Sequence, residues 1–257
     1  MTFRPSDDSR PTYALFAALL EGDYDAEAPW QAVSALRLRG TQEVFVLGAE
    51  YCRSPNPWAR ARGLDVLGQL GAGKPDAERP YLAQCVSIAI ESLKDSEAMV
   101  VHSAAWALAH LATDDAVGAL LQLKQHPDPD VRHAVAMGVA ATSGPQAVAA
   151  LLELTVDPDD NVRDWATFGL GSQSSEDSRQ IREALRRRLQ DPYEPARSEA
   201  VWGLALRKDP AGLRLLLERL ESEEPQQGDV YTAQEILDLA EGAAFEDLCA
   251  GLRKLLE

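Results

Sequence analysis

The sequence predicts an all-α fold, a right-handed α-solenoid (superhelix) of about six to seven stacked helix pairs. An eleven-residue pattern recurs along the chain, and an apolar segment of helical length follows each copy. The apolar share of 46% is mostly Ala, Leu and Val, whereas aromatic residues make up only 6%, which favours closely packed helices over a β-sandwich. Each pair has one face that it cannot bury alone, so stacking would create a continuous core.

The recurring pattern predicts the first helix of each pair. It is clearest at residues 161–171 and 195–205, and four further copies align with these, at residues 130–140, 99–109, 58–68 and, more weakly, 28–37. In the copy at 161–171, Val162, Ala166 and Leu170 recur at a spacing that places them on one stripe of a helix. Small residues within the pattern would let a neighbouring helix approach closely.

A second apolar helix is expected after each full copy, at residues 81–93, 116–124, 146–155, 181–189 and 211–220. Residues 71–79 are interpreted as an insertion between the two helices of one pair. We expect a single α-solenoid domain over residues 1–257, with an N-terminal cap at 12–27, repeats at 28–222 and a C-terminal capping hairpin at 230–257.

The order Asp-Pro, Arg six residues after the Asp, then Ala and Gly-Leu resembles the HEAT repeat. The short period of 31 residues makes the chain most similar to the phycobilin-lyase type of HEAT-like repeat, over roughly residues 28–222. This resemblance implies an Asp–Arg ladder between adjacent repeats, which maps onto Asp157 with Arg163 and Asp191 with Arg197. Two departures predict that the ladder is interrupted: one repeat has Asp95 but Val101 in place of the Arg, and the next has Arg132 but His126 in place of the Asp.

Charge and composition exclude several classes of protein. The net charge of −16 argues against nucleic-acid binding, because such binding relies on neutralising phosphates. No apolar run approaches the ~20 residues that span a bilayer, and the first residues lack the apolar core of a secretory signal. Cys52, Cys85 and Cys249 form neither a disulfide framework nor a metal-ligand cluster, so a cytoplasmic location is expected.

The sequence displays no catalytic constellation, and no cofactor or metal is predicted. Residues 68–74 match most of a phosphate-binding loop, but Pro75 stands where the Mg²⁺-binding hydroxyl should be. The histidines lack metal-ligand spacing; they are His102, His110, His126 and His133. The acidic turns at 128–130 and 157–160 are interpreted as helix caps. A binding protein is therefore a better expectation than an enzyme.

The leading hypothesis is a non-catalytic interaction or adaptor module that holds a protein or peptide partner along the solenoid surface. One locally basic helix is the candidate for contact with an acidic partner, through Arg179, Arg182, Arg186 and Arg187. A set of aromatic residues at one equivalent repeat position is the second candidate surface, namely Trp106, Phe168 and Trp202. These rings either pack between successive repeats or form an exposed ridge for a partner.

Three alternatives stay open at this level. The acidic composition is also suited to an immunity or inhibitor protein that blocks a basic target. The family resemblance implies a bilin lyase-like, chromophore-handling protein. A DNA-repair glycosylase of HEAT-like fold is third, because Trp165 follows Asp164, but groove-lining basic residues are not evident.

Overall fold

The computed structural model describes residues 8–24, 26–71, 79–142, 144–222 and 224–257. Within these ranges the chain forms fifteen α-helices and one short π-helix, and it contains no β-strand. The predicted all-α class is confirmed. Contacts divide the chain into two compact units, unit 1 at Met1–Gly138 and unit 2 at Val139–Glu257. In the described part of the chain, no helix is both long enough and apolar enough to cross a membrane.

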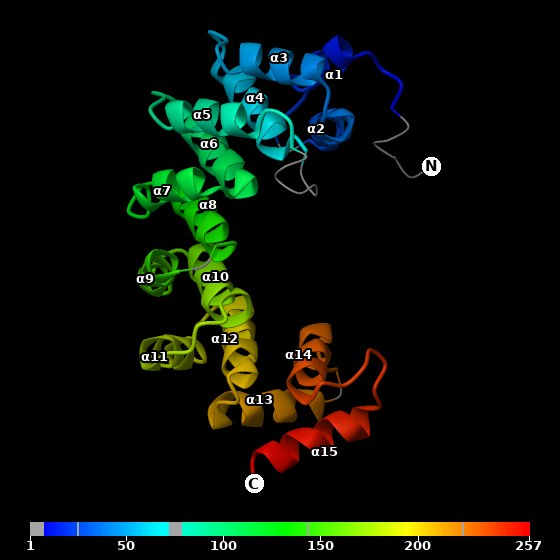
Figure 1. Cartoon of the computed structure of the whole chain (residues 1–257), viewed down its shortest axis with the longest axis vertical. Helices are drawn as coiled ribbons and strands as arrows, with labels where there is room; N and C mark the ends of the chain where they lie inside the picture. Colours follow the sequence, from blue (N-terminus) through cyan, green and yellow to red (C-terminus); the bar gives the residue numbers. More distant parts are fainter. Residues whose placement is uncertain (1–7, 25, 72–78, 143, 223) are drawn as a thin grey trace. The chain divides into compact units, whose positions relative to one another are not determined.

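Unit 1 contains the first helix pairs (Figure 1). Its helices are α1 (Thr12–Ala18), α2 (Glu27–Arg39), α3 (Gln42–Tyr51), α4 (Pro57–Gln69), α5 (Leu82–Ser92), α6 (Ala98–Leu111), α7 (Asp114–Leu121) and most of α8 (Pro129–Ala140). The first helices of the pairs pack side by side, α2 on α4 and α4 on α6, while α3, α5 and α7 pack beside them. The insertion predicted at 71–79 falls mostly outside the described residues.

Unit 2 repeats this arrangement. Its elements are α9 (Pro145–Leu154), α10 (Asp160–Phe168), the π-helix η3 (Gly169–Gln173), α11 (Arg179–Arg188), α12 (Glu194–Leu206), α13 (Pro210–Leu220), α14 (Gln227–Leu237) and α15 (Phe245–Leu255). Helices α10, α12 and α14 pack in succession, and α9 and α11 lie along one side of α10 and α12 (Figure 1). The last hairpin, α14 and α15, packs on α13 around a core that includes Leu216, Leu248 and Leu252.

The predicted stripe is the buried face of the first helices. Val162, Ala166 and Leu170 are all fully buried. Close approach of the helices depends on glycine at one crossing in unit 2. A Cβ atom on Gly203 of α12 would lie 2.4 Å from the Cα atom of Gly171 in η3, so neither position has room for a side chain.

The C-terminal end of η3 is held by the side chain of Arg207. The Arg207 guanidinium donates hydrogen bonds to the main-chain carbonyls of Leu170, Gly171 and Ser174, at 2.6 to 2.8 Å. These carbonyls lie at the end of a helix, where main-chain acceptors lack helical partners. Arg207 therefore satisfies them and ties η3 to α12.

We expect Gly203→Ala to lower the free energy of unfolding by about 1–3 kcal/mol, because the added methyl group overpacks the crossing with Gly171. Urea denaturation followed by circular dichroism measures this change. Gly118→Ala in α7 is the matched control: its Cβ would meet nothing within 4 Å, so this helix-favouring change should raise stability by about 0.5–1 kcal/mol. Equal effects of the two substitutions would contradict the close crossing.

Candidate functional site

The described part of unit 1 contains a cavity of about 600 Å³, lined by residues from α2, α4, α6, α8 and the connection before α2. Three aromatic side chains form much of its wall: Tyr24, Trp30 and Trp106. Met99, Ala107 and Gly68 add apolar surface, and Gln69, His102, His110 and Asp130 add polar groups. A cavity of this size, mostly apolar with a few polar groups, has the character of a ligand-binding pocket.

A hydrogen-bonded network supports one wall of the cavity. The Tyr24 hydroxyl donates to Asp65 Oδ2 at 2.7 Å, and the Ser103 hydroxyl lies 2.7 Å from the same Tyr24 oxygen. Asp65 also pairs with Arg62, whose Nη1 atom is 3.2 Å from Oδ2. Because the single phenolic proton goes to Asp65, Ser103 is the donor in its contact with Tyr24.

Arg62 is the largest fully buried side chain in the described structure, and its charge is satisfied from several sides. Its Nε atom donates to the Leu19 carbonyl at 3.1 Å, and its Nη2 atom donates to the Tyr24 carbonyl. The guanidinium also stacks on two rings, 4.0 Å from the centroid of Tyr24 and 5.0 Å from that of Trp30. Arg62 thereby fixes the orientation of two cavity walls.

The polar groups of this network bond to one another, and burial changes their protonation. Burial raises the pKa of Tyr24 well above its ordinary value, and the Asp65 charge raises it further. Burial also raises the pKa of Asp65, against the opposing effects of the Tyr24 hydrogen bond and the Arg62 charge. The hydrogen bonds of this network hold one wall of the cavity in place.

One edge of the cavity is positively charged. Gln69 lines the cavity, and its side-chain oxygen accepts a hydrogen bond of 3.4 Å from Arg37 of α2, which is not itself a lining residue. In the described residues, no carboxylate pairs with Arg37. Desolvation lowers the pKa of His110 at this edge, and the positive charges of Arg37 and Arg79 lower it further.

Three of the four histidines surround Trp106. The ring centroids of His102, His110 and His133 lie 6.0, 6.1 and 5.1 Å from that of Trp106. His133 is half-buried against this ring. A search of the described side chains finds no group of three or more His, Cys, Asp or Glu that could hold a metal ion.

The structure places the three predicted aromatic residues in different surroundings. Trp106 lines the cavity of unit 1. In unit 2, the Phe168 ring lies edge-on to Trp165, 5.4 Å between centroids. Trp202 packs on Gly228, and its indole N–H donates to Asp229 at 2.7 Å, so it joins α12 to α14. An exposed ridge formed by these residues stays a prediction.

The four predicted arginines lie on α11, and three of them already face carboxylates of this chain. The pairs are Arg179 with Glu183, Arg182 with Asp177 and Asp209, and Arg186 with Asp209. Arg187 is exposed and makes no ion pair with a described residue. Contact of this helix with an acidic partner stays a prediction, and these internal pairs would compete with it.

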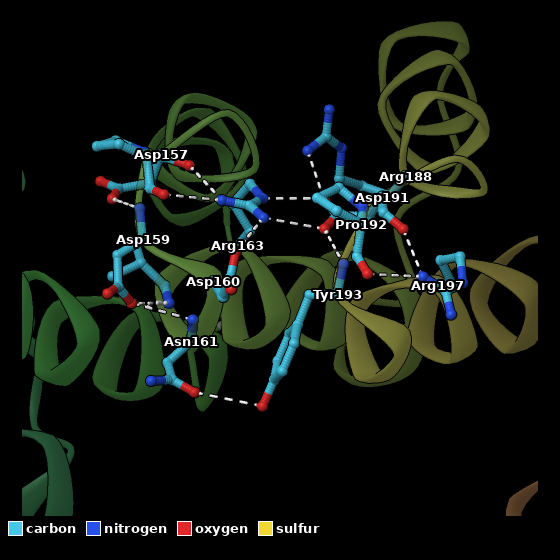
Figure 2. Close-up of polar contacts among 12 residues, drawn as sticks. Asp157, Asp159, Asp160, Asn161, Arg163, Arg188, Asp191, Pro192, Tyr193 and Arg197 are labelled. Atoms are coloured by element: carbon cyan, nitrogen blue, oxygen red, sulfur yellow. Dashed lines mark hydrogen bonds and ion pairs between the residues drawn. The ribbon is translucent and has the colours of Figure 1, made fainter.

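The predicted ladder residues form a connected network in unit 2 (Figure 2). Arg163 binds both carboxylate oxygens of Asp191, at 2.9 and 3.0 Å, and thereby joins one repeat to the next. Arg163 reaches Asp157 of its own repeat through the main-chain carbonyl, at 2.9 Å. Likewise Arg197 donates to the Asp191 carbonyl. The observed carboxylate pairing therefore runs between repeats, whereas the sequence assignment had paired Asp157 with Arg163 and Asp191 with Arg197.

The turn between repeats has the same local geometry at five positions. A side-chain acceptor receives the main-chain N–H two residues later, and the acceptors are Ser54, Asp95, His126, Asp157 and Asp191, at 2.9 to 3.2 Å. Six residues after this acceptor, an arginine donates to the carbonyl of the acceptor residue in four repeats, through Arg60, Arg132, Arg163 and Arg197. Side chains thus satisfy both a main-chain N–H group and a main-chain carbonyl of the turn.

The structure corrects the predicted interruption at Asp95. This carboxylate is bound by Arg60 of the preceding repeat, at 2.7 and 2.8 Å, so its step of the ladder is intact. Arg60 pairs with Asp95 and Arg163 with Asp191, the acidic position of the following repeat, and by the same register Val101 corresponds to His126. The two departures seen in the sequence are therefore one interruption. The loss of the cation at Val101 coincides with the loss of the anion at His126, which leaves no unpaired buried charge.

Two carboxyl groups in unit 2 have pKa values raised toward neutral pH. Burial raises the pKa of Glu199 to about 7, and the nearby Asp164 charge contributes. Burial also raises the pKa of Asp164 to about 6, together with the charges of Glu194 and Asp191. The Ser172 hydroxyl donates to Glu199 at 3.2 Å. These groups make the stability of unit 2 sensitive to pH near neutrality.

Sequence reasoning missed most of the cavity residues, in particular Tyr24, Trp30 and Asp65. One signal was present: Arg62 and Asp65 are opposite charges three residues apart within the apolar pattern at 58–68. Charges on the buried stripe of a repeat helix require partners, and this pair indicates a polar site behind α4. Nothing in the sequence pattern locates Tyr24, which precedes the first repeat.

The repeats also match a known protein family. The sequence profile of HEAT repeats matches residues 86–171 and 153–229, which together make up more than half of the chain. The resemblance inferred from the repeat pattern is thus confirmed. No curated protein matches the sequence.

Solved structures of repeat solenoids are similar to this chain. The Escherichia coli protein YibA is 25% identical, with a TM-score of 0.71 over 95% of this chain and 91% of that one. A chain in the complex of CpcE and CpcF of phycocyanin lyase from Nostoc is 15% identical, with a TM-score of 0.54 over 100% and 97%. A designed armadillo repeat protein in complex with the peptide (KR)4 is 16% identical, with a TM-score of 0.50 over 73% and 95%. These matches confirm the predicted α-solenoid class.

We expect Arg163→Met to lower the free energy of unfolding by about 3 kcal/mol, because it removes the main partner of the buried Asp191 carboxylate. Urea denaturation measures the change. Arg179→Met is the matched control, since Arg179 is exposed and pairs only with Glu183, and it should leave stability unchanged. A loss of similar size in both variants would contradict a structural role specific to the ladder.

The raised pKa of Glu199 predicts a pH dependence of stability. The folded state holds this proton more tightly than the unfolded state, so stability should fall as pH rises from about 4.5 to about 7 and then level off. Glu199→Gln should flatten this fall in denaturation curves recorded between pH 5 and pH 8. Glu183→Gln is the control, since the pKa of Glu183 is lowered by Arg179, and it should leave the fall in place.

Proposed function

Because the chain belongs to the HEAT repeat family, we propose that it is a non-catalytic interaction module that holds a segment of a protein partner. The cavity of unit 1 is the proposed anchoring site. One observation carries this proposal: a pocket with aromatic walls whose orientation is fixed by a buried hydrogen-bonded network. Repeat solenoids are typical scaffolds for protein interaction.

The wall composition supports this choice of anchor. Trp, Tyr and Arg dominate the binding energy of protein interfaces, where they act from desolvated pockets surrounded by less important contacts. Trp30, Trp106 and Tyr24 are half-buried, so each offers apolar area while part of the ring is already packed. Since Arg62 and the histidines hold these rings in place, a partner would bind without the entropic cost of ordering them.

The similarity to a designed armadillo protein in complex with a peptide supports the same class of function. A peptide partner therefore fits both the fold and the cavity. Inhibition of a basic target by the acidic surface, and a cytoplasmic location, stay predictions from the charge and the cysteines.

A second candidate function is handling of a bilin chromophore. The same cavity favours it, because flat aromatic walls and imidazoles would suit a planar conjugated ligand. Visible absorbance of the purified protein, lost when the cavity is filled, would favour this candidate over the interaction module.

The test is a quantitative pull-down from the source cells with variants inside and outside the cavity. Trp106→Ala removes a wall, and Met99→Trp fills the space without removing a hydrogen bond. We expect one partner at about equal molar amount with the wild type, reduced at least tenfold in both variants. Tyr13→Ala is the control, because Tyr13 is an aromatic residue of unit 1 that is 70% exposed away from the cavity, and it should retain the partner.

The same experiment includes Arg186→Glu/Arg187→Glu on α11. Loss of the partner only in this variant would move the contact to the predicted arginine surface and overturn the cavity as anchor. Equal binding by all variants would also overturn the cavity as the anchoring site. The absence of any stoichiometric partner would overturn the interaction module itself. Thermal unfolding of each variant separates loss of binding from loss of fold.

A further inference from the structure

Residues in and beside the cavity of unit 1 carry opposite charges, and this bears on the chemistry of its occupant. Asp130 lines the cavity from α8, whereas Gln69 and His110 line it from α4 and α6. Arg37 of α2 does not line the cavity, but it donates a hydrogen bond to Gln69, which does. The cation and Asp130 therefore belong to different helices, α2 and α8 (Figure 1).

Arg37 has fewer described acceptors than most half-buried arginines of this chain. Arg60, Arg182 and Arg188 each pair with a carboxylate. Arg39, Arg197 and Arg207 each donate to at least two main-chain carbonyls. The chain has 41 acidic residues against 25 basic ones, yet Arg37 has only a long hydrogen bond to the neutral Gln69 side chain in the described structure. A partly desolvated guanidinium without an anion is unfavourable, so an anion brought by a ligand would gain a strong, charge-assisted contact there.

The rest of the cavity selects for an aromatic group. Trp30 and Trp106 present apolar faces and edges, and the Tyr24 hydroxyl is already committed to Asp65. An aromatic ring inserted here would make edge-on or offset contacts with these walls. Arg62 already occupies one face of both Tyr24 and Trp30, so a second guanidinium could not stack on these faces.

We propose that the occupant of this cavity is a peptide segment of the partner in which an aromatic residue lies next to, or one residue from, Asp or Glu. The ring fills the space between Trp30 and Trp106, and the carboxylate binds Arg37 at the edge marked by Gln69 and His110. Asp130 disfavours the opposite orientation because it would repel the carboxylate. The rest of the segment is neutral or basic, because the net charge of −16 opposes a strongly acidic peptide.

This inference rests on the proposed function, and a peptide selection tests it separately. A random twelve-residue library displayed on phage is selected on the full-length protein and counter-selected on Met99→Trp, in which the cavity is filled. We expect enrichment of sequences with Trp, Tyr or Phe beside an acidic residue. Enrichment of basic motifs, or no enrichment over the filled variant, would overturn the inference.

A double-mutant cycle then tests the contact with Arg37. Fluorescence polarisation with an enriched peptide should show about tenfold weaker binding for Arg37→Gln, and a similar loss when the peptide acid is replaced by its amide. The two changes together should cost little more than either alone, because both remove one interaction. Arg53→Gln is the matched control: Arg53 is an exposed arginine of unit 1 bonded to the Ala49 carbonyl, and its loss should not weaken binding.

Additive losses in the cycle would show that the peptide acid does not meet Arg37 and would overturn the orientation proposed here. The outcomes also separate the two proposals. A partner that depends on Trp106 in the pull-down, together with selected peptides that lack an acidic residue, would leave the interaction module standing and remove only this inference.

Discussion

The structure depends most on one repeated contact, an arginine side chain that replaces missing main-chain hydrogen bonds at the turn between repeats. In four repeats this arginine donates to the carbonyl six residues before it, while the side chain at that earlier position accepts a main-chain N–H two residues on. The turn is thus closed from both sides by side chains. Where the following repeat offers Asp95 or Asp191, the same guanidinium also binds its carboxylate, so one charge fixes a turn and a junction together.

This geometry explains why the ladder tolerates the change at His126. The imidazole Nδ1 accepts the N–H of Asp128, as a carboxylate does elsewhere, so the turn keeps its local acceptor. His126 lacks the negative charge of the carboxylate found at this position in other repeats. The arginine that would pair with that charge is also absent, because the buried Val101 occupies its position. The turn motif and the charge pair are separable parts of the repeat, and only the second is optional.

The sequence predicted the repeat helices well because their signal is local. The stripe of Val162, Ala166 and Leu170 is a period within one helix, and each second helix lies within a few residues of its predicted range. The candidate site was harder to predict because its members come from different helices and from the connection before the first repeat. Tyr24 reaches Ser103 across 79 residues, and no periodic pattern encodes such a contact. The ladder pairing was misassigned for the same reason, since Arg163 and Asp191 are matched only after the repeats are stacked.

The buried Arg62 has a consequence for the modularity of the chain. Repeat proteins are often treated as strings of exchangeable units, with a terminal cap that serves to cover the core. Here two acceptors of a fully buried charge are the main-chain carbonyls of Leu19 and Tyr24, both in the N-terminal cap region. Removing or replacing that region would leave the Arg62 guanidinium buried in the first full repeat without these two acceptors. The cap and the repeat behind it therefore form a single structural unit.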